Sequence, residues 1–255
     1  RSDAKKRKGD ECAMAGSISI RDLTVTRGSF TLRVDALDVE PREVFAILGR
    51  TGSGKTVLME SIAGAFPLDG GTILLDGKDV ESLPIQQRHM GVVYQDHALF
   101  PHMTVRENIA YGLKMNGCPR DEAERRVSEQ MALFGIDGIA DKHPGIISGG
   151  EAQRTALARA LVLQPEILLL DEPFSALDPS TKERMYDTIR DIHARFDCTI
   201  VFVTHDFNEA AMLADRAGIV LDGNLRAILP AAQLFAAECD EDVAAFLGRE
   251  RNSLA

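Results

Sequence analysis

Alternating apolar and polar residues predict two paired strands near the start of the chain. Residues 18–25 and 30–39 alternate on either side of Arg27, which is typical of an antiparallel hairpin. The next apolar stretch differs, because residues 44–48 are apolar without interruption and lead into a glycine-rich segment and a helix beginning near Lys55. A short continuous apolar run is expected of a strand buried on both faces. The pattern predicts a buried strand, a loop and a helix in succession.

Further apolar strands end at Asp171 and Thr204, and helical pattern adjoins each of them. Buried strands that alternate with helices favour a mostly parallel sheet covered by helices. A last hairpin is predicted from residues 218–221 and 225–229, which flank a turn beginning at Asp222. The predicted fold class is therefore α/β, with an antiparallel β subdomain at the N-terminal end.

Strand pattern is absent between about residues 97 and 162, and helical pattern replaces it. Helices are predicted over 104–115 and 120–134, and in the second helix Glu122 and Arg126 are spaced to pair across one turn. We expect this segment to form an α-helical subdomain inserted into the sheet domain.

The length and the net charge of the chain exclude several classes of function. The chain has 255 residues, of which 45% are apolar, so it can fill a globular core. A formal net charge of -10 argues against general affinity for nucleic acid or anionic lipid. The 4 cysteines are scattered without zinc-ligand or disulfide spacing, which favours reduced thiols. No apolar run reaches the roughly 18 to 20 residues of a membrane-spanning helix.

The two ends differ from the patterned middle. Residues 1–16 carry a cluster of basic side chains with no apolar segment behind it, which favours a solvated tail over a secretory signal. We expect one domain over residues 17–248, followed by a short tail over 249–255.

A glycine-rich loop carries the strongest chemical signal. Its sequence fits G-x-x-x-x-G-K-[ST], in which glycines let the backbone amides face a polyphosphate and the following helix adds its positive end. Within it, Lys55 is expected to reach the β- and γ-phosphates, and the hydroxyl of Thr56 is expected to bind Mg²⁺. The residues of the loop are Gly49, Arg50, Thr51, Gly52, Ser53, Gly54, Lys55 and Thr56.

Two adjacent acids end a buried strand at Asp171 and Glu172. Burying like charges together is costly, so such a pair indicates a nearby cation or reaction. Beside a phosphate loop, Asp171 is predicted to hold Mg²⁺ indirectly, through a coordinated water or another ligand of the ion. Glu172 is predicted to be the base that orients and polarises the attacking water.

A second anion-binding helix start is predicted at Ser148, Gly149, Gly150 and Glu151. A serine cap and exposed glycine amides suit a phosphate, and the helix is expected to run to about residue 163. One ATP does not need two such sites from one subunit.

Taken together, these motifs resemble the nucleotide-binding subunit of an ATP-binding cassette (ABC) transporter over about residues 17–248. The motifs that carry the resemblance are the loop 49–56, Gln95, the run 147–151, the acids Asp171 and Glu172, the run 175–178, and His205.

The resemblance implies a P-loop NTPase core that uses ATP and Mg²⁺. It also implies a head-to-tail dimer in which ATP on one subunit is capped by Ser148 and Gly150 of the other. In this family pattern Gln95 senses Mg²⁺ and the attacking water, and His205 contacts the γ-phosphate. Asp178 would lie along the dimer seam.

Two departures from the family pattern stand out. Ile147 replaces the usual leucine before the serine, a mild change that should leave the amide site intact. Arg27 stands where many relatives stack an aromatic ring on adenine, and a guanidinium can stack as well. We expect Arg27 to contact the base and Phe30 to belong to the core.

The run 98–109 resembles the helical subdomain of importers and implies a peripheral protein on the cytoplasmic face of the membrane. Its partners would be permease subunits and, indirectly, a substrate-binding protein. The whole chain looks most similar to molybdate and tungstate importers, with iron, sulfate, polyamine or sugar importers as alternatives. Residues 246–248 resemble the point where many importers continue into a regulatory β-domain, so the chain is either truncated there or lacks that control.

Two other classes are weighed against the importer. A soluble ABC ATPase acting on DNA or ribosomes usually carries a long coiled coil or two cassettes, and neither is present between Lys55 and Ser148. A nucleotide-gated scaffold without turnover is disfavoured because Glu172, Gln95 and His205 are all retained. No nucleic-acid partner is expected.

Overall fold

The computed structural model describes residues 15–175, 177–236 and 240–248. Its strands form one 10-stranded sheet in the order β5-β4-β1-β2-β10-β9-β3-β8-β7-β6. The strands are β1 (Ile18–Arg27), β2 (Phe30–Val39), β3 (Val44–Leu48), β4 (Gly70–Leu75), β5 (Lys78–Asp79), β6 (Met90–Val93), β7 (Ile167–Asp171), β8 (Thr199–Thr204), β9 (Arg216–Leu221) and β10 (Asn224–Pro230). The helices are α1 (Lys55–Ala63), α2 (Val105–Met115), α3 (Arg120–Phe134), α4 (Gly149–Leu161), α5 (Pro179–Phe196), α6 (Phe207–Leu213) and α7 (Glu241–Phe246).

The sheet has a parallel part and an antiparallel part. Strand β3 runs parallel to β8 and β9, and β7 runs parallel to β6 and β8. The hairpin β1–β2 and the strands β4 and β5 pair antiparallel at the other end. Strands β2 and β10 meet through one pair, Asn224 with Arg33. The predicted α/β fold and its N-terminal antiparallel subdomain are confirmed.

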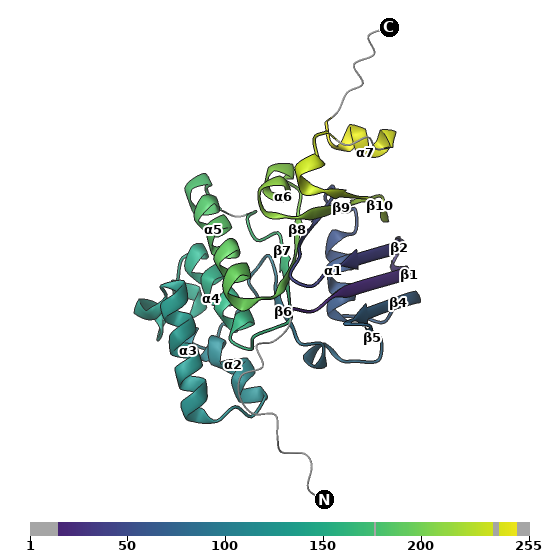
Figure 1. The fold of residues 1–255 in the computed structure, drawn as a ribbon. Helices are drawn as coiled ribbons and strands as arrows, with labels where there is room; N and C mark the ends of the chain where they lie inside the picture. The colour runs from purple at the N-terminus through teal and green to yellow at the C-terminus, as the bar shows by residue number, and fades with distance from the viewer. Residues whose placement is uncertain (1–14, 176, 237–239, 249–255) are drawn as a thin grey trace, which may run out of the picture.

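The inserted segment is helical, as predicted. Helices α2, α3 and α4 gather on the side of the molecule away from the β1–β2 hairpin (Figure 1). A capping box begins α2, because Thr104 accepts from the backbone of Glu107 and the Glu107 side chain accepts from the backbone of Thr104. The predicted pair of Glu122 and Arg126 on α3 forms at 2.6 Å.

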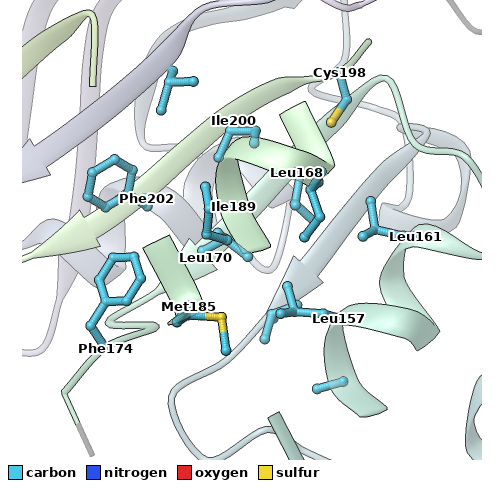
Figure 2. Packing of buried hydrophobic residues seen from close by; sticks show 14 of the residues in the cluster. Leu157, Leu161, Leu168, Leu170, Phe174, Met185, Ile189, Cys198, Ile200 and Phe202 are labelled. Carbon is cyan, nitrogen blue, oxygen red and sulfur yellow. The ribbon is translucent and has the colours of Figure 1, made fainter. Parts of the chain in front are cut away.

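Period-two alternation divides the central strands between two hydrophobic clusters. Leu168, Leu170, Ile200 and Phe202 of β7 and β8 belong to the larger cluster, which side chains of α4 and α5 cover (Figure 2). The intervening residues of the same strands face α1 in the smaller cluster, together with the apolar side chains of β1 and β2. Each fully buried side chain of this size contributes about 1.5–3 kcal/mol. This packing fixes the ends of β3, β7 and β8, where the predicted site residues stand.

The predicted tails lie almost wholly outside the described residues. Ala15 and Gly16 are the exceptions, and the N–H of Gly16 donates to the carbonyl of Glu166 while its carbonyl accepts from the hydroxyl of Thr199. The cysteines in the described part, Cys118 and Cys198, are both free. No helix in that part combines the length and apolar character needed to cross a membrane.

Candidate functional site

The glycine-rich loop connects β3 to α1, as predicted. Gly52 and Gly54 have φ values of 80° and 108°, a region that side chains with a Cβ rarely adopt. A Cβ on Gly49 would lie 2.3 Å from the carbonyl oxygen of Val220, so this close approach also requires glycine. The hydroxyl of Ser53 is buried without a hydrogen-bond partner. The loop therefore holds a conformation that glycine alone permits and keeps an unsatisfied polar group.

Lys55 is buried beneath the loop that it follows. Its ammonium donates to the carbonyl oxygens of Gly49 at 2.9 Å and Arg50 at 3.0 Å. Burial lowers the pKa of Lys55 below its usual value, and the carboxylates of Glu172 and Asp171 act in the opposite direction. The ammonium of Lys55 is thus directed into the concavity formed by the backbone.

Thr56 and Asp171 meet at the ends of α1 and β7. The Thr56 hydroxyl lies 3.3 Å from both carboxylate oxygens of Asp171. Burial raises the pKa of Asp171, and the hydrogen bond from Thr56 opposes that shift. A hydroxyl beside a carboxylate provides the oxygen ligands that Mg²⁺ prefers.

Glu172 and His205 face each other across the ends of two adjacent parallel strands. Oε2 of Glu172 lies 3.5 Å from Nδ1 of His205. Glu172 has a φ of 44° and its N–H donates to the carbonyl of Val203, which turns its side chain away from the strand direction. The Glu172 side chain is 19% exposed and that of His205 is 58% exposed, so solvent reaches the space between them.

Gln95 is connected to Glu172 through one hydroxyl. The Gln95 amide donates to Oγ of Ser175 at 3.2 Å, and that hydroxyl donates to the Glu172 carbonyl at 3.0 Å. Because Gln95 follows β6 and precedes the helical subdomain, this chain of bonds joins that subdomain to the strand that bears the paired acids.

Ser148 begins α4 with a capping box. Its hydroxyl accepts from the backbone N–H of Glu151, whose carboxylate accepts from the Ser148 N–H at 2.7 Å. These bonds lower the pKa of Glu151. A Cβ on Gly149 would meet nothing within 4 Å, and one on Gly150 would meet only the Arg154 guanidinium at 3.7 Å. Neither glycine is required by packing within the chain, so the space that it leaves open is available to a ligand.

Asp178 has a local structural role. It is the N-cap of α5, where its carboxylate accepts from the backbone N–H groups of Ser180 and Thr181. Hydrogen bonds from Thr181 and Ser180 hold the pKa of Asp178 well below its usual range. Its neighbour in the predicted motif, Ala176, lies outside the described residues.

The predicted residues line two separate cavities. A groove of about 690 Å³ is bordered by the predicted residues Gln95, Ser148, Gly150, Glu172 and Asp178. A smaller cavity of about 250 Å³ adjoins the loop residues Arg50 to Ser53 and residues of β9 and α7. Among the described residues, the Ser148 segment therefore borders the first of these cavities and the loop borders the second.

Arg27 is directed to a neighbouring side chain. Its guanidinium lies 3.6 Å from the ring centroid of Phe66, in a cation–π contact, and it donates to the carbonyl of Thr26. The predicted contact of Arg27 with the base stays a prediction. Phe30 is half-buried and packs against the smaller hydrophobic cluster, with its ring 2.8 Å from where a Cβ on Gly54 would stand.

The residues present fit Mg-ATP. The loop offers a buried ammonium and an unsatisfied Ser53 hydroxyl, both of which suit phosphate oxygens. Among the described residues no three His, Cys, Asp or Glu side chains form a metal cluster. A site made from Thr56 and Asp171 suits Mg²⁺, which keeps several waters and takes further ligands from substrate phosphates.

Comparison with known proteins places the chain in a family. The family model described as ABC transporter matches residues 32–175, which is more than half of the chain. The chain belongs to the ABC transporter family. Accordingly, this ABC protein is an ATPase that uses ATP and Mg²⁺, and the predicted P-loop NTPase fold is confirmed.

Relatives of the ABC protein are import ATPases. It is 45% identical to the molybdate/tungstate import ATP-binding protein WtpC of Pyrococcus horikoshii over 91% of this chain and 68% of the relative. It is 41% identical to the Fe(3+) ions import ATP-binding protein FbpC 1 of Rhizobium meliloti over 91% of this chain and 66% of the relative. The chain thus spans about two thirds of the length of these relatives.

A solved structure shares the fold of the ABC protein. CbiO1 from Clostridium perfringens, described as part of the ABC transporter complex cbiONQ, superposes with a TM-score of 0.78. It is 27% identical and the match covers 86% of this chain and 90% of that chain.

Sequence reasoning missed two buried polar residues of the ABC protein near the site, Gln153 and Glu209, and the half-buried Lys182. Gln153 donates to the carbonyl of Pro173, directly after Glu172. Lys182 and Glu209 pair at 2.8 Å between α5 and α6. The sequence feature that could have identified Glu209 is an acidic residue among apolar residues on a short helix, because a buried carboxylate requires a partner.

Proposed function

We propose that this protein is the ATP-hydrolysing subunit of an importer for an inorganic oxyanion such as molybdate or tungstate. The similarity to WtpC over most of the chain supports this substrate class. Importers for iron or sulfate are the main alternatives, because ATP-binding proteins of such importers are 41% and 44% identical to this chain. In this proposal the subunit works at the cytoplasmic face of the membrane with permease subunits, which receive cargo from a substrate-binding protein.

One observation carries the proposal that two copies act together. The Ser148 segment carries two glycines, Gly149 and Gly150, beside which only the Arg154 guanidinium of the same subunit lies within 4 Å of a Cβ position, and it borders a different cavity from the phosphate loop. A capped helix start with free amides suits a phosphate. ATP bound by the loop of one copy would therefore be enclosed by Ser148 and Gly150 of a second copy in a head-to-tail dimer.

The residues of the loop bind and orient the nucleotide. Lys55 exchanges its bonds with the Gly49 and Arg50 carbonyls for bonds with the β- and γ-phosphates. Thr56 and Asp171 would hold Mg²⁺, which would supply positive charge beside the phosphate oxygens. Because Lys55 is already buried and directed into the loop, little reorganisation is needed when phosphate arrives.

Hydrolysis requires an oriented water molecule. Glu172 accepts a hydrogen bond from the attacking water and receives its proton, while His205, 3.5 Å from that carboxylate, contacts the γ-phosphate. Gln95 orients the same water, and because Ser175 bonds its amide to the Glu172 carbonyl while the helical subdomain follows Gln95 in the chain, Gln95 reports the presence of that water to the helical subdomain. Loss of the γ-phosphate would therefore loosen the region where permease subunits are expected to bind.

Sedimentation and transport measurements test the proposal. With excess ATP, the Glu172→Gln variant should sediment as a dimer, either alone or with its permease supplied. A monomer under both conditions contradicts the dimer. Vesicles carrying the permease and this subunit should take up molybdate in an ATP-dependent manner, and uptake of Fe³⁺ in its place would reassign the substrate.

A further inference from the structure

A buried carboxylate on α6 lies close to the catalytic region without touching it. The Glu209 side chain is only 4% exposed, although α6 is a short helix near the surface. Burying a charged carboxylate is costly unless it is paired and hydrogen-bonded. The hydrogen-bond partners of Glu209 therefore indicate the role of this carboxylate.

One oxygen of Glu209 is bonded to the segment that carries His205. The Thr204 hydroxyl donates to Oε2 of Glu209, and the same hydroxyl accepts from the backbone N–H of Asp206 at 3.0 Å. Thr204 and Asp206 are the residues on either side of His205. The carboxylate therefore fixes the backbone both before and after the histidine.

The other oxygen of Glu209 is bonded to the helix that follows the paired acids. Lys182 donates to Oε1 at 2.8 Å, and its own backbone N–H donates to the carbonyl of Asp178, the N-cap of α5. The hydrogen bond to Glu209 raises the pKa of Lys182, so this ammonium is charged at neutral pH. The Lys182 side chain is 27% exposed, which gives the pair partial shielding from solvent.

We propose that Lys182 and Glu209 are positioning residues for hydrolysis, which hold His205 at a fixed distance from Glu172 and from the start of α5. Neither residue touches the nucleotide, so both act through the backbone around His205. This inference rests on the proposed roles of Glu172 and His205. Since the pair makes no contact with the phosphate loop, it governs turnover and leaves nucleotide binding unchanged.

The separation of turnover from binding provides the test. In Glu209→Gln, which keeps the shape of the side chain and removes its charge, kcat should fall on the order of 10- to 100-fold because His205 is misplaced. The affinity for ATP, measured by equilibrium dialysis, should stay within about twofold of the wild type. Lys182→Arg, which retains the charge, should restore most of the kcat that Lys182→Met loses.

A double variant keeps the test valid if Lys182→Met does not fold. Lys182→Met leaves Glu209 buried without its cation, whereas the double variant Lys182→Met with Glu209→Gln removes both charges and should fold. Its kcat should match that of Glu209→Gln, because two residues acting as one unit are not additive. Asp187→Asn is the matched control, since it removes an exposed ion pair with Arg190 on the same helix and leaves the bond from Arg190 to the carbonyl of Met212 in place. It should leave kcat unchanged.

Two results would overturn the inference. The first is a Glu209→Gln variant with wild-type kcat and a lower thermal midpoint, which would assign the pair to stability alone. The second is an ATP affinity that falls in parallel with kcat. A wild-type protein that hydrolyses no ATP, alone or with its permease, would instead contradict the proposed function itself.

Discussion

The ammonium of Lys55 lies 2.9 Å from the carbonyl oxygen of Gly49, so the cation expected to meet phosphate is bonded to the loop that surrounds it. A buried ammonium has three donors, and two of them point to carbonyls of the loop. The lysine is thus held in place before any nucleotide arrives, and its removal affects binding more directly than folding.

Lys55→Ala should weaken ATP binding. Charge-assisted hydrogen bonds contribute about 1.5–3 kcal/mol, which corresponds to about 10- to 100-fold in the dissociation constant. Equilibrium dialysis with labelled ATP measures the change. Lys78→Ala, which removes an exposed lysine on β5, is the control and should bind ATP normally. Unchanged affinity in Lys55→Ala would mean that the loop does not hold the phosphates.

Glu172→Gln should abolish turnover while ATP still binds. The amide cannot accept the proton of the attacking water, so kcat should fall by about 10²- to 10⁴-fold. Phosphate release under saturating ATP measures the loss. Glu183→Gln, an exposed acid on α5, should retain the wild-type rate. If Glu172→Gln hydrolyses ATP at close to the wild-type rate, another group activates the water.

Gly150→Ala should separate folding from assembly. The added methyl would meet only Arg154 at 3.7 Å, so the thermal midpoint of the free subunit should be unchanged. In the proposed dimer the same methyl would obstruct the phosphate of the opposite copy, and both assembly and ATPase activity should be lost. Gly138→Ala is a matched control, because the methyl added there would meet nothing within 4 Å. An active Gly150→Ala dimer would contradict this placement.

Cys198 should resist thiol reagents in the folded protein. Burial raises the pKa of its thiol from 9.0 to about 11, so little thiolate forms at pH 8. In the unfolded protein the Cys198 thiol ionises at a lower pH than in the folded protein. The contribution of the protonated thiol to the free energy of unfolding is therefore lost as the pH rises from 9 towards 11. Mass spectrometry after iodoacetamide treatment should show Cys118 modified before Cys198. Rapid labelling of Cys198 at pH 8 would argue against this burial.

The sequence predicts the central strands closely because their environment leaves a clear pattern. Residues 44–48 are apolar at every position since both faces of β3 are buried. The alternation in β1 and β2 follows from one buried and one exposed face. The loop 49–56 is predictable for a different reason, because phosphate binding restricts both its spacing and its residue types.

Long-range pairing leaves no comparable pattern in the sequence. The short strand β5 and its pairing with β4 escape prediction, because the two residues Lys78 and Asp79 are exposed and polar. The bond between Gln95 and Ser175 and the pair of Lys182 with Glu209 join segments far apart in the chain. The spacing of these residues along the sequence carries no information about such contacts.

One ladder pair, Asn224 with Arg33, joins β2 to β10, whereas side chains from β1 and β2 share a hydrophobic cluster with α1. The hairpin and the helix that begins at Lys55 are therefore connected mainly by side-chain packing and less by backbone hydrogen bonds. A movement of α1 when nucleotide enters or leaves would be transmitted to the outer strands through the packed side chains that they share. Replacing Leu32 or Ile62 with a smaller residue would weaken this packing, while the residues expected to bind phosphate would stay in place.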